Sequence, residues 1–285
     1  MPGAEGSADG LVSASCREVA GVRTYLLSGG KGEAVVFLHG LGASSYSWRY
    51  LLPAFAKTYS VYAPDFPGYG RSDKPCDFDY TFGGFEKWLE AFLDSQGITR
   101  AVLVGNSMGG AVSLRLALQK PDRVSALVLI GAPLYLDNIP KILWTLRTPI
   151  LGRILEPFLG RWTVKLIAPS AFLDRRQITE DVLDEYSLAL KTRAGRRAAA
   201  ETVRRCLTPD LPELISRYGE LKAPVLFIRG DHDAVVDQAS AEKFCRTVPR
   251  GGCLCIPVCG HVPQEEKPDV VSAAISGFLA DGAAA

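Results

Sequence analysis

The sequence predicts an α/β protein with a mostly parallel sheet covered by helices on both faces. Short, strand-like apolar runs alternate with segments of helical spacing, and runs such as 34–38 are apolar at every position, as in strands buried on both sides. From about residue 134 to 209 the rhythm changes to apolar stretches broken by prolines, followed by charged, helix-favouring residues. We therefore expect a core made of residues 1–133 and 210–285, with an inserted helical cap at 134–209.

The composition narrows the function classes. The 285 residues hold 32 Lys and Arg against 31 Asp and Glu, so the net charge of +1 predicts no nucleic-acid surface. No run approaches ~18 apolar residues, so we predict no membrane span, and residues 1–10 do not resemble a signal peptide. An odd count of 7 cysteines without an export signal favours reduced thiols in the cytoplasm. Cys253, Cys255 and Cys259 cluster, but we interpret them as small apolar residues rather than a metal site.

In the first half of the chain, predicted strands alternate with predicted helices. We expect strands at 13–19 and 22–27 joined as a hairpin near Ala20-Gly21, a strand at 34–38, a helix at 48–56 and a strand at 61–63. Residues 65–72 are rich in turn formers and predict a loop. A helix through 85–93 has i, i+3, i+4, i+7 apolar spacing, and Gly97 is placed to end it.

The second half continues the alternation around the cap. We expect strands at 101–104, 126–130, 224–228 and 253–256, a helix at 111–118 and a closing helix at 270–278. The cap has many apolar residues, which we expect to pack on the core and line a pocket; they are Ile142, Trp144, Leu146, Ile150, Leu151, Ile154, Leu155, Phe158, Leu159 and Trp162. The alternative is a lid that binds a membrane interface, because basic and apolar residues interleave here.

A candidate nucleophile lies between the strand at 101–104 and the next helix. The sequence Gly105-Asn106-Ser107-Met108-Gly109-Gly110 has the G-x-S-x-G spacing of a nucleophile elbow, a strained turn that projects a serine hydroxyl. The glycines keep the backbone around that turn clear. A serine is a weak nucleophile without a base, so the rest of the chain must supply one.

The base follows by elimination, because the chain has only 3 histidines. His39 lies in a Gly-rich turn and suits loop shaping, and His232 lies between two aspartates in a surface turn. His261 follows the last strand in a loop next to Gly260, so we predict it as the base.

The acid that orients His261 should come from a loop after an earlier strand. Asp233 gives the chain order Ser, Asp, His. Asp231, which we interpret as a turn-capping residue, and Asp137, after the strand at 126–130, remain as alternatives.

The oxyanion of an acyl-transfer reaction needs backbone N–H donors. Met108 follows the nucleophile at a helix N-terminus, where free amides and the helix dipole favour negative charge. The second donor is expected from the loop at 39–42, at Leu41.

Five ordered motifs together resemble the α/β-hydrolase superfamily: His39-Gly40-Leu41-Gly42, Asp65-x-x-Gly68-x-Gly70-x-Ser72, Gly105–Gly110, Gly230-Asp231-His232-Asp233 and Gly260-His261. The resemblance covers nearly the whole chain except the cap and tail. It implies an eight-stranded, mostly parallel sheet, a helical cap inserted after the sixth strand and no cofactor. It also implies an architectural role for Asp65 and the 68–72 loop.

Within that superfamily, haloalkane dehalogenases and epoxide hydrolases use an aspartate nucleophile, which Ser107 does not match. We predict a serine hydrolase of the carboxylesterase type, acting on small to medium, largely apolar esters. The elbow is also similar to that of meta-cleavage product hydrolases, which break carbon–carbon bonds. Against them, Gly40-Leu41-Gly42-Ala43 and Val262 depart from their pattern, although Arg193, Arg196 or Arg197 could replace their carboxylate-binding arginine.

A small-molecule receptor of this fold is a further alternative, since such receptors can keep an intact triad. The expected partner is a small-molecule ester, and a homodimer stays open.

Overall fold

The computed structural model describes residues 10–135, 148–206 and 209–282. Its centre is one eight-stranded sheet in the order β1-β2-β4-β3-β5-β6-β7-β8. β2 pairs antiparallel with β1 and β4, and all other neighbours pair in parallel. The strands are β1 (Val12–Val19), β2 (Val22–Gly29), β3 (Ala34–Leu38), β4 (Ser60–Pro64), β5 (Ala101–Asn106), β6 (Val124–Ile130), β7 (Val225–Gly230) and β8 (Gly251–Ile256). The predicted eight-stranded, mostly parallel sheet is confirmed.

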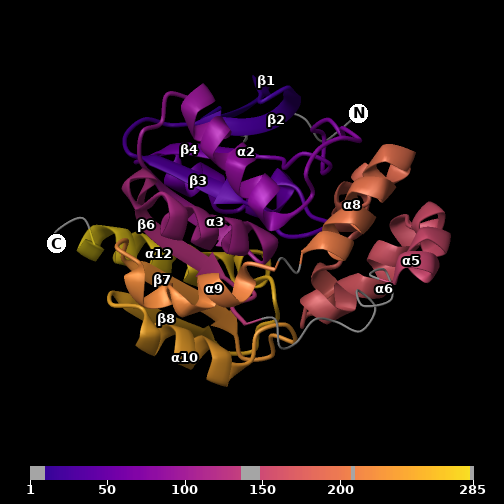
Figure 1. The fold of residues 1–285 in the computed structure, drawn as a ribbon. Coiled ribbons are helices and arrows are strands. Elements are labelled where there is room, and N and C mark those ends of the chain that lie inside the picture. Colours follow the sequence, from indigo (N-terminus) through magenta and orange to yellow (C-terminus); the bar gives the residue numbers. More distant parts are fainter. Residues whose placement is uncertain (1–9, 136–147, 207–208, 283–285) are drawn as a thin grey trace.

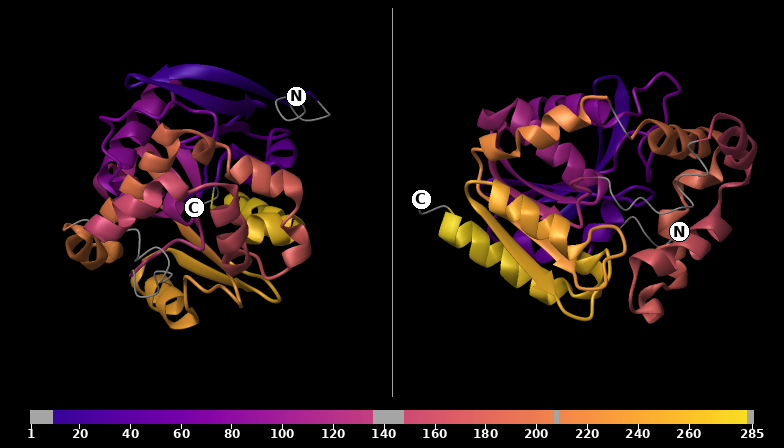
Figure 2. Two further views of the ribbon diagram at one scale, coloured as in Figure 1. Left: turned by 90° about the vertical axis from the view of Figure 1, so that its right-hand side faces the viewer. Right: turned by 60° about the horizontal axis from the view of Figure 1, so that its bottom comes forward.

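Helices cover both faces of this sheet, as Figures 1 and 2 show. One face carries α2 (Phe82–Ser95), α3 (Met108–Gln119), α9 (Leu211–Ser216) and α10 (Gln238–Thr247), and the other carries α1 (Leu52–Phe55) and α12 (Pro268–Gly282). Short 3-10 turns are η1 (Ser45–Trp48), η2 (Pro121–Arg123) and η6 (Tyr218–Glu220), and α11 is Pro263–Glu266. Two hydrophobic clusters therefore form the core, one on each face.

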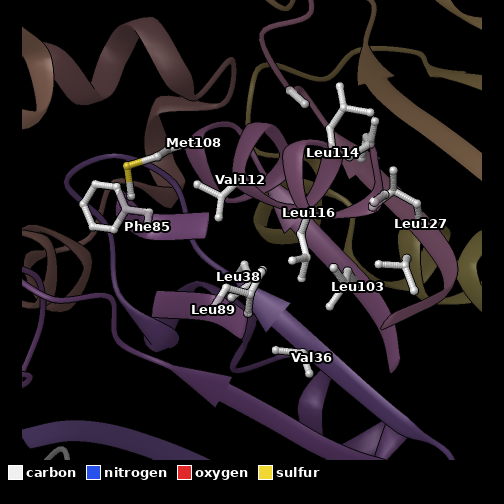
Figure 3. Close-up of a cluster of buried hydrophobic side chains, with 14 of the residues drawn as sticks. Val36, Leu38, Phe85, Leu89, Leu103, Met108, Val112, Leu114, Leu116 and Leu127 are labelled. Carbon is white, nitrogen blue, oxygen red and sulfur yellow. The ribbon is translucent and has the colours of Figure 1, made fainter. Parts of the chain in front are cut away.

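The strand β3 shows why both faces are apolar. Val36 and Leu38 point to the α2–α3 side, while Val35 and Phe37 point to the α1–α12 side, and all four are fully buried. Figure 3 shows the first side, where Val36 and Leu38 lie among side chains of α2, α3, β5 and β6. Continuous apolar strands were the observation that predicted this arrangement.

Most local predictions are confirmed within a few residues. The hairpin turns at Ala20 and Gly21 with positive φ at both residues (48° and 78°), as a type I′ turn requires, and Gly97 (φ 68°) follows the end of α2. The helix predicted at 48–56 is shorter than expected: α1 covers only Leu52–Phe55, and the separate 3-10 turn η1 precedes it. The helix α10 was not predicted, although Asp237 caps it by accepting from the backbone N of Ser240 at 2.7 Å.

Between β6 and β7 the described chain is helical, which is where we expect the cap. We call α5 (Pro149–Leu155), η3 (Glu156–Phe158), α6 (Arg161–Ala171), η4 (Arg175–Gln177), α7 (Glu180–Tyr186), η5 (Ala189–Lys191) and α8 (Arg193–Arg205) the cap helices. Ile142, Trp144 and Leu146 lie outside the described residues. The expectation that the remaining apolar residues are covered is wrong for Ile150, Ile154, Phe158 and Trp162, which are 77%, 57%, 63% and 60% exposed. The exposed apolar side chains lie on α5, η3 and α6, whereas Val182 and Leu183 of α7 and Ala198 of α8 are buried.

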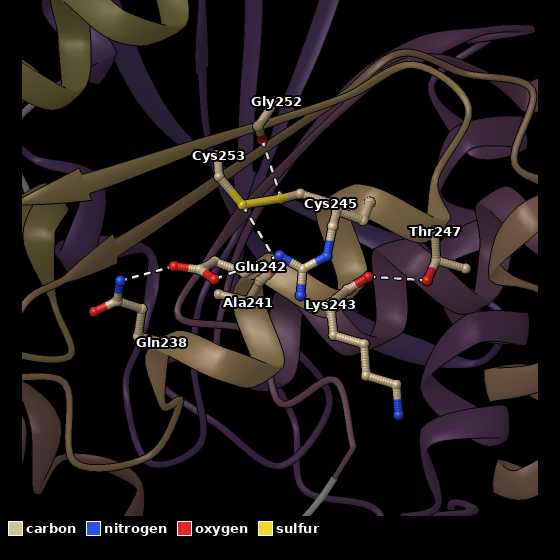
Figure 4. The surroundings of a disulfide bond; sticks show 9 residues. Gln238, Ala241, Glu242, Lys243, Cys245, Thr247, Gly252 and Cys253 are labelled. Atoms are coloured by element: carbon tan, nitrogen blue, oxygen red, sulfur yellow. Dashed lines mark hydrogen bonds and ion pairs between the residues drawn. A yellow bond between two sulfur atoms is a disulfide. The ribbon is translucent and has the colours of Figure 1, made fainter.

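Cys245 and Cys253 form a disulfide between the last turn of α10 and β8, with their Cα atoms 6.1 Å apart (Figure 4). The prediction that the thiols are reduced is therefore wrong for this pair. Cys255 is exposed, and Cys259 is buried. Among the described residues no group of three or more metal-ligating side chains occurs, and no helix there is long and apolar enough to cross a bilayer.

Candidate active site

Ser107 occupies the sharp turn between β5 and α3. Its backbone has φ 49° and ψ −115°, a conformation that costs energy for a residue with a side chain and is common at functional turns. The neighbouring glycines are required by close approach: a Cβ on Gly105 would overlap the backbone of Gly109, and a Cβ on Gly110 would lie 2.6 Å from the Cβ of Ala132. The predicted strand, strained turn and helix are therefore present.

His261 and Asp233 come together at the same edge of the sheet. His261 Nδ1 lies 2.9 Å and 3.0 Å from the two carboxylate oxygens of Asp233. Both residues are more than 90% buried. Because a carboxylate only accepts, Nδ1 carries the proton and Nε2 is left with a free lone pair. This is the tautomer that a general base needs.

Backbone amides hold Asp233 in place. Its Oδ1 accepts from the N–H groups of Val235 at 2.8 Å and Val236 at 3.1 Å. These donors fix the orientation of the carboxylate toward the imidazole.

The loop of His261 is joined to the elbow through Asn106. The Asn106 side chain is buried, and its Nδ2 donates to the carbonyls of Ile130 at 3.0 Å and His261 at 3.3 Å. In the described chain no hydrogen bond links Ser107 Oγ to the His261 ring. Hydrogen bonds of this kind are often long without substrate and tighten in the complex.

The predicted oxyanion donors flank the same turn. Met108 is the first residue of α3, so its N–H lies at the positive end of the helix dipole. Leu41 is in the loop after β3, and a Cβ on the preceding Gly40 would lie only 3.3 Å from the Cβ of Ser107. The loop with the Leu41 amide therefore passes directly beside the candidate nucleophile.

The other histidines have different surroundings. His39 is fully buried, where its Nδ1 donates to Gly40 O at 2.8 Å and its Nε2 accepts from Phe66 N at 3.0 Å. Burial lowers the pKa of His39, so it is neutral and holds two loops together. His232 is exposed and bonds to Asp231 at 2.6 Å.

The rival acids and the 65–72 loop can also be placed. Asp231 accepts from Cys259 N at 3.1 Å, in keeping with a turn-capping role, and Asp137 lies outside the described residues. Asp65 accepts from Ser45 N and Arg71 N at 2.7 Å each, and Ser72 Oγ donates to the Asp65 carbonyl at 2.7 Å. These bonds brace loops, as the resemblance implies.

Two buried carboxylates after His261 were not predicted as part of the site. Glu266 Oε2 accepts from Gly260 N at 2.6 Å, while its Oε1 accepts from Leu173 N and Asp174 N, both at 2.8 Å. In addition, His261 N donates to Ala171 O at 2.7 Å. The loop carrying His261 is thus fastened to the end of α6 through backbone groups.

Glu265 forms a second link to the cap helices. It pairs with Arg49 at 2.7 Å and accepts a short hydrogen bond from the Tyr186 hydroxyl, which lies 2.8 Å from Ser47 Oγ. Burial raises the pKa of Glu265, and the Arg49 guanidinium opposes this shift. Burial and the adjacent carboxylate raise the pKa of Tyr186 well above its usual value. The run Glu265-Glu266 after the base was a visible signal, but its partners are far away in the sequence.

The cap arginines lie elsewhere. Arg193, Arg196 and Arg197 line an open cavity of about 830 Å³ beside Lys74 and Tyr80, and none of Ser107, Asp233 and His261 lines it.

Comparisons with known proteins show the family of the chain. A family model described as alpha/beta hydrolase fold matches residues 33–268. The chain is 31% identical to a 2-hydroxy-6-oxo-6-(2'-aminophenyl)hexa-2,4-dienoic acid hydrolase of Metapseudomonas resinovorans (91% of this chain, 88% of the relative). It is 28% identical to the uncharacterized hydrolase YugF of Bacillus subtilis (87% and 90%). Among solved structures it is similar to haloalkane dehalogenase DbeA from Bradyrhizobium elkani USDA94, with TM-score 0.85, 26% identity and coverage of 96% and 99%. The chain belongs to the α/β-hydrolase fold family.

Proposed function

We propose that the protein is a serine hydrolase that cleaves carboxylic esters of small to medium, largely apolar substrates. The observation that carries the proposal is Ser107 on a strained turn at a helix N-terminus, next to a buried His261–Asp233 pair. That arrangement supplies a nucleophile, a base in the required tautomer and an acid that stabilises the imidazolium. An aspartate-based displacement of halide is disfavoured because the elbow residue is serine.

The proposed reaction has two halves. Ser107 Oγ attacks the ester carbonyl while His261 Nε2 takes its proton, and the amides of Met108 and Leu41 donate to the oxyanion. The intermediate collapses, His261 returns the proton to the departing alcohol, and an acyl-enzyme remains. Water then attacks the acyl-enzyme with His261 as base, and the acid leaves from Ser107.

Two variants that each lose one serine hydroxyl, Ser107→Ala and Ser125→Ala, test this assignment. Wild type should hydrolyse a p-nitrophenyl ester, and Ser107→Ala should abolish turnover above background. Ser125→Ala is the control, because the Ser125 hydroxyl on β6 has no hydrogen-bond partner within the described chain. A fluorophosphonate should label wild type with loss of fluoride, at a peptide containing Ser107. Retained turnover in Ser107→Ala would overturn the proposal.

Carbon–carbon cleavage of dienoic ring-fission products is a second candidate, favoured by the 31% identity to the hydrolase of Metapseudomonas resinovorans. Against it, the arginines of α8 line a cavity apart from the proposed triad. Parallel assays on short-chain esters, long-chain esters, lactones and a dienoic ring-fission product separate the two, since a strong preference for the last would replace the ester proposal. Tight ligand binding with turnover far below one event per minute would instead indicate a receptor.

Two further predictions from the sequence are a cytoplasmic location and a homodimer. A cytoplasmic location is opposed by the Cys245–Cys253 disulfide, because such bonds persist mainly in oxidising compartments. Sedimentation of the wild-type protein measures whether it is a homodimer.

A further inference from the structure

The cap helices carry a continuous apolar surface that nothing in the described chain covers. Its five members, which we call the apolar stripe, are Ile150, Ile154, Phe158, Trp162 and Leu166, with exposed fractions of 77%, 57%, 63%, 60% and 59%. Ile150 and Ile154 are four apart on α5, and Trp162 and Leu166 are four apart on α6, so each pair shares a helix face. Trp162 Nε1 donates to Phe158 O at 2.7 Å, which connects the two halves.

The stripe lies at the outside of the molecule. Figure 1 shows α5 beyond α8 as seen from the sheet, with α6 beside α5 and running back toward the core, and the left view of Figure 2 looks at that side of the protein. The five side chains are all large, and their clustering differs from the scattered exposed apolar residues found on most surfaces. Such a patch marks an interaction site.

The charges on the helices of the stripe favour an anionic partner. Residues 149–166 hold three cations and one anion: Arg153, Arg161, Lys165 and Glu156. Arg161 pairs with Asp184 and Glu180, and Glu156 pairs with Arg204, whereas Arg153 and Lys165 are exposed and have no ion pair in the described part of the chain. Two exposed cations without an ion pair in the described chain, Arg153 and Lys165, are therefore carried by α5 and α6, and Arg153 also lines the cavity beside α8.

A second copy of the chain fits these charges poorly. In a two-fold interface each patch faces itself, so the uncompensated cations of the two copies would be brought together. An anionic lipid surface instead receives the apolar side chains in its interior and pairs with the cations at its headgroups. Trp162 suits the boundary between the two layers, because its indole N–H is already satisfied by Phe158 O and the rest of the ring is apolar.

We propose that the apolar stripe docks the cap helices onto an anionic lipid bilayer. The helices lie in the interface and do not span the membrane. Each free cation contributes about fivefold to binding, which corresponds to roughly 1 kcal/mol per charge near an anionic membrane. The docking is independent of turnover, so it can be tested without a substrate.

Vesicle flotation at 0.15 M salt tests the proposal, using phosphatidylcholine vesicles with and without about 30% phosphatidylglycerol. Wild type should bind the anionic vesicles at least tenfold more strongly than the neutral ones. Ile154→Ser/Phe158→Ser/Trp162→Ser should lose both kinds of binding. Arg153→Gln/Lys165→Gln should lower binding to the anionic vesicles about 25-fold and leave the neutral vesicles unaffected.

Tyr50→Ser/Val270→Ser is the matched control, because both residues are large, apolar and about half exposed (52% and 47%) but lie away from the stripe. It should bind vesicles as wild type does. Circular dichroism and turnover of a water-soluble p-nitrophenyl ester report whether each variant is folded and whether the proposed hydrolase activity survives.

Three results would overturn the proposal. The first is wild type that stays unbound with both vesicles, and the second is a triple variant that binds as well as wild type. The third is sedimentation of wild type as a dimer that the triple variant converts to monomer, with no vesicle binding, which would assign the stripe to a second copy. None of these results depends on whether Ser107 is a nucleophile.

Discussion

Replacing Glu266 with glutamine should reduce both stability and turnover, because one buried carboxylate joins the His261 loop to the cap helices. Its Oε2 accepts from Gly260 N, the residue before the proposed base, and its Oε1 accepts from Leu173 N and Asp174 N. These three donors are backbone groups, so they cannot rotate away when the acceptor changes; Cys259 Sγ is a fourth, weak donor, 3.7 Å from Oε2. Glu266 is a positioning residue in this scheme and touches no substrate.

The size of the effect follows from what an amide can do in that place. If the side-chain oxygen of the glutamine accepts from Leu173 N and Asp174 N, its NH₂ group faces the N–H of Gly260. Two hydrogen-bond donors then face each other. A hydrogen bond to a charged group contributes about 1.5–3 kcal/mol, and a buried unsatisfied donor costs about 1–3 kcal/mol. We expect Glu266→Gln to lower the free energy of unfolding by about 2–4 kcal/mol and Tm by roughly 5–15 °C.

Turnover should fall for a separate reason. Without the bond to Gly260 the His261 ring can shift relative to Ser107, and a displacement of about 1 Å can reduce a rate by 10²-fold. We expect kcat on a p-nitrophenyl ester to fall roughly 10- to 100-fold, with KM changed much less because the substrate pocket is intact.

The assay pairs urea unfolding with steady-state kinetics well below the variant's Tm. Glu213→Gln on α9 is the control, since Glu213 is exposed and its carboxylate has no partner in the described residues. Wild-type stability and kcat in Glu266→Gln would refute the reasoning. A loss of stability with unchanged kcat would limit Glu266 to a structural role.

Four further predictions come from the same contacts. Asp233→Asn should lower kcat about 10³–10⁴-fold, measured on the same ester, because the amide imposes the wrong imidazole tautomer. Burial lowers the pKa of His39, so below about pH 6.5 the unfolded chain binds a proton that the folded chain does not. As the pH is lowered through this range, the free energy of unfolding should fall by up to about 1.4 kcal/mol per pH unit. His39→Gln should make this slope shallower in urea titrations. The pKa of Tyr186 is raised, so above about pH 10 the unfolded chain releases a proton that the folded chain keeps; stability should fall with rising pH, less steeply in Tyr186→Phe. Cys245→Ser/Cys253→Ser should lower unfolding free energy by about 2–3 kcal/mol for a loop with separation 8, measured by calorimetry, and dithiothreitol should do the same to wild type.

The parts of the candidate site that could be predicted are those encoded locally. Ser107 stands in a glycine-flanked turn between a strand and a helix, and the order of the motifs named Asp233 and His261 before any contact was visible. Parallel strands end at the same edge of a sheet, so residues that follow them meet. The hydrogen bond between Asp233 and His261 follows from that topology.

Glu266 could not be predicted in the same way. Besides the weak donor Cys259 Sγ, its partners are the backbone N–H groups at 173, 174 and 260, which every sequence has, so residue types give little signal of the contact. Whether a carboxylate next to a catalytic loop faces solvent or backbone depends on how the cap helices pack against the core. That packing is a long-range property.

The exposure of the apolar stripe could not be predicted from the sequence either. On α2, Phe85, Leu89 and Phe92 repeat at helical spacing and are fully buried against the sheet. On α5 and α6 a similar spacing produces an exposed face. Periodicity states only that a helix has one apolar side; what lies opposite that side depends on the rest of the fold, and for Ile154 and Trp162 no part of the described chain lies there. A membrane in that position explains why so exposed an apolar surface is accompanied by two free cations, and a second copy of the chain does not.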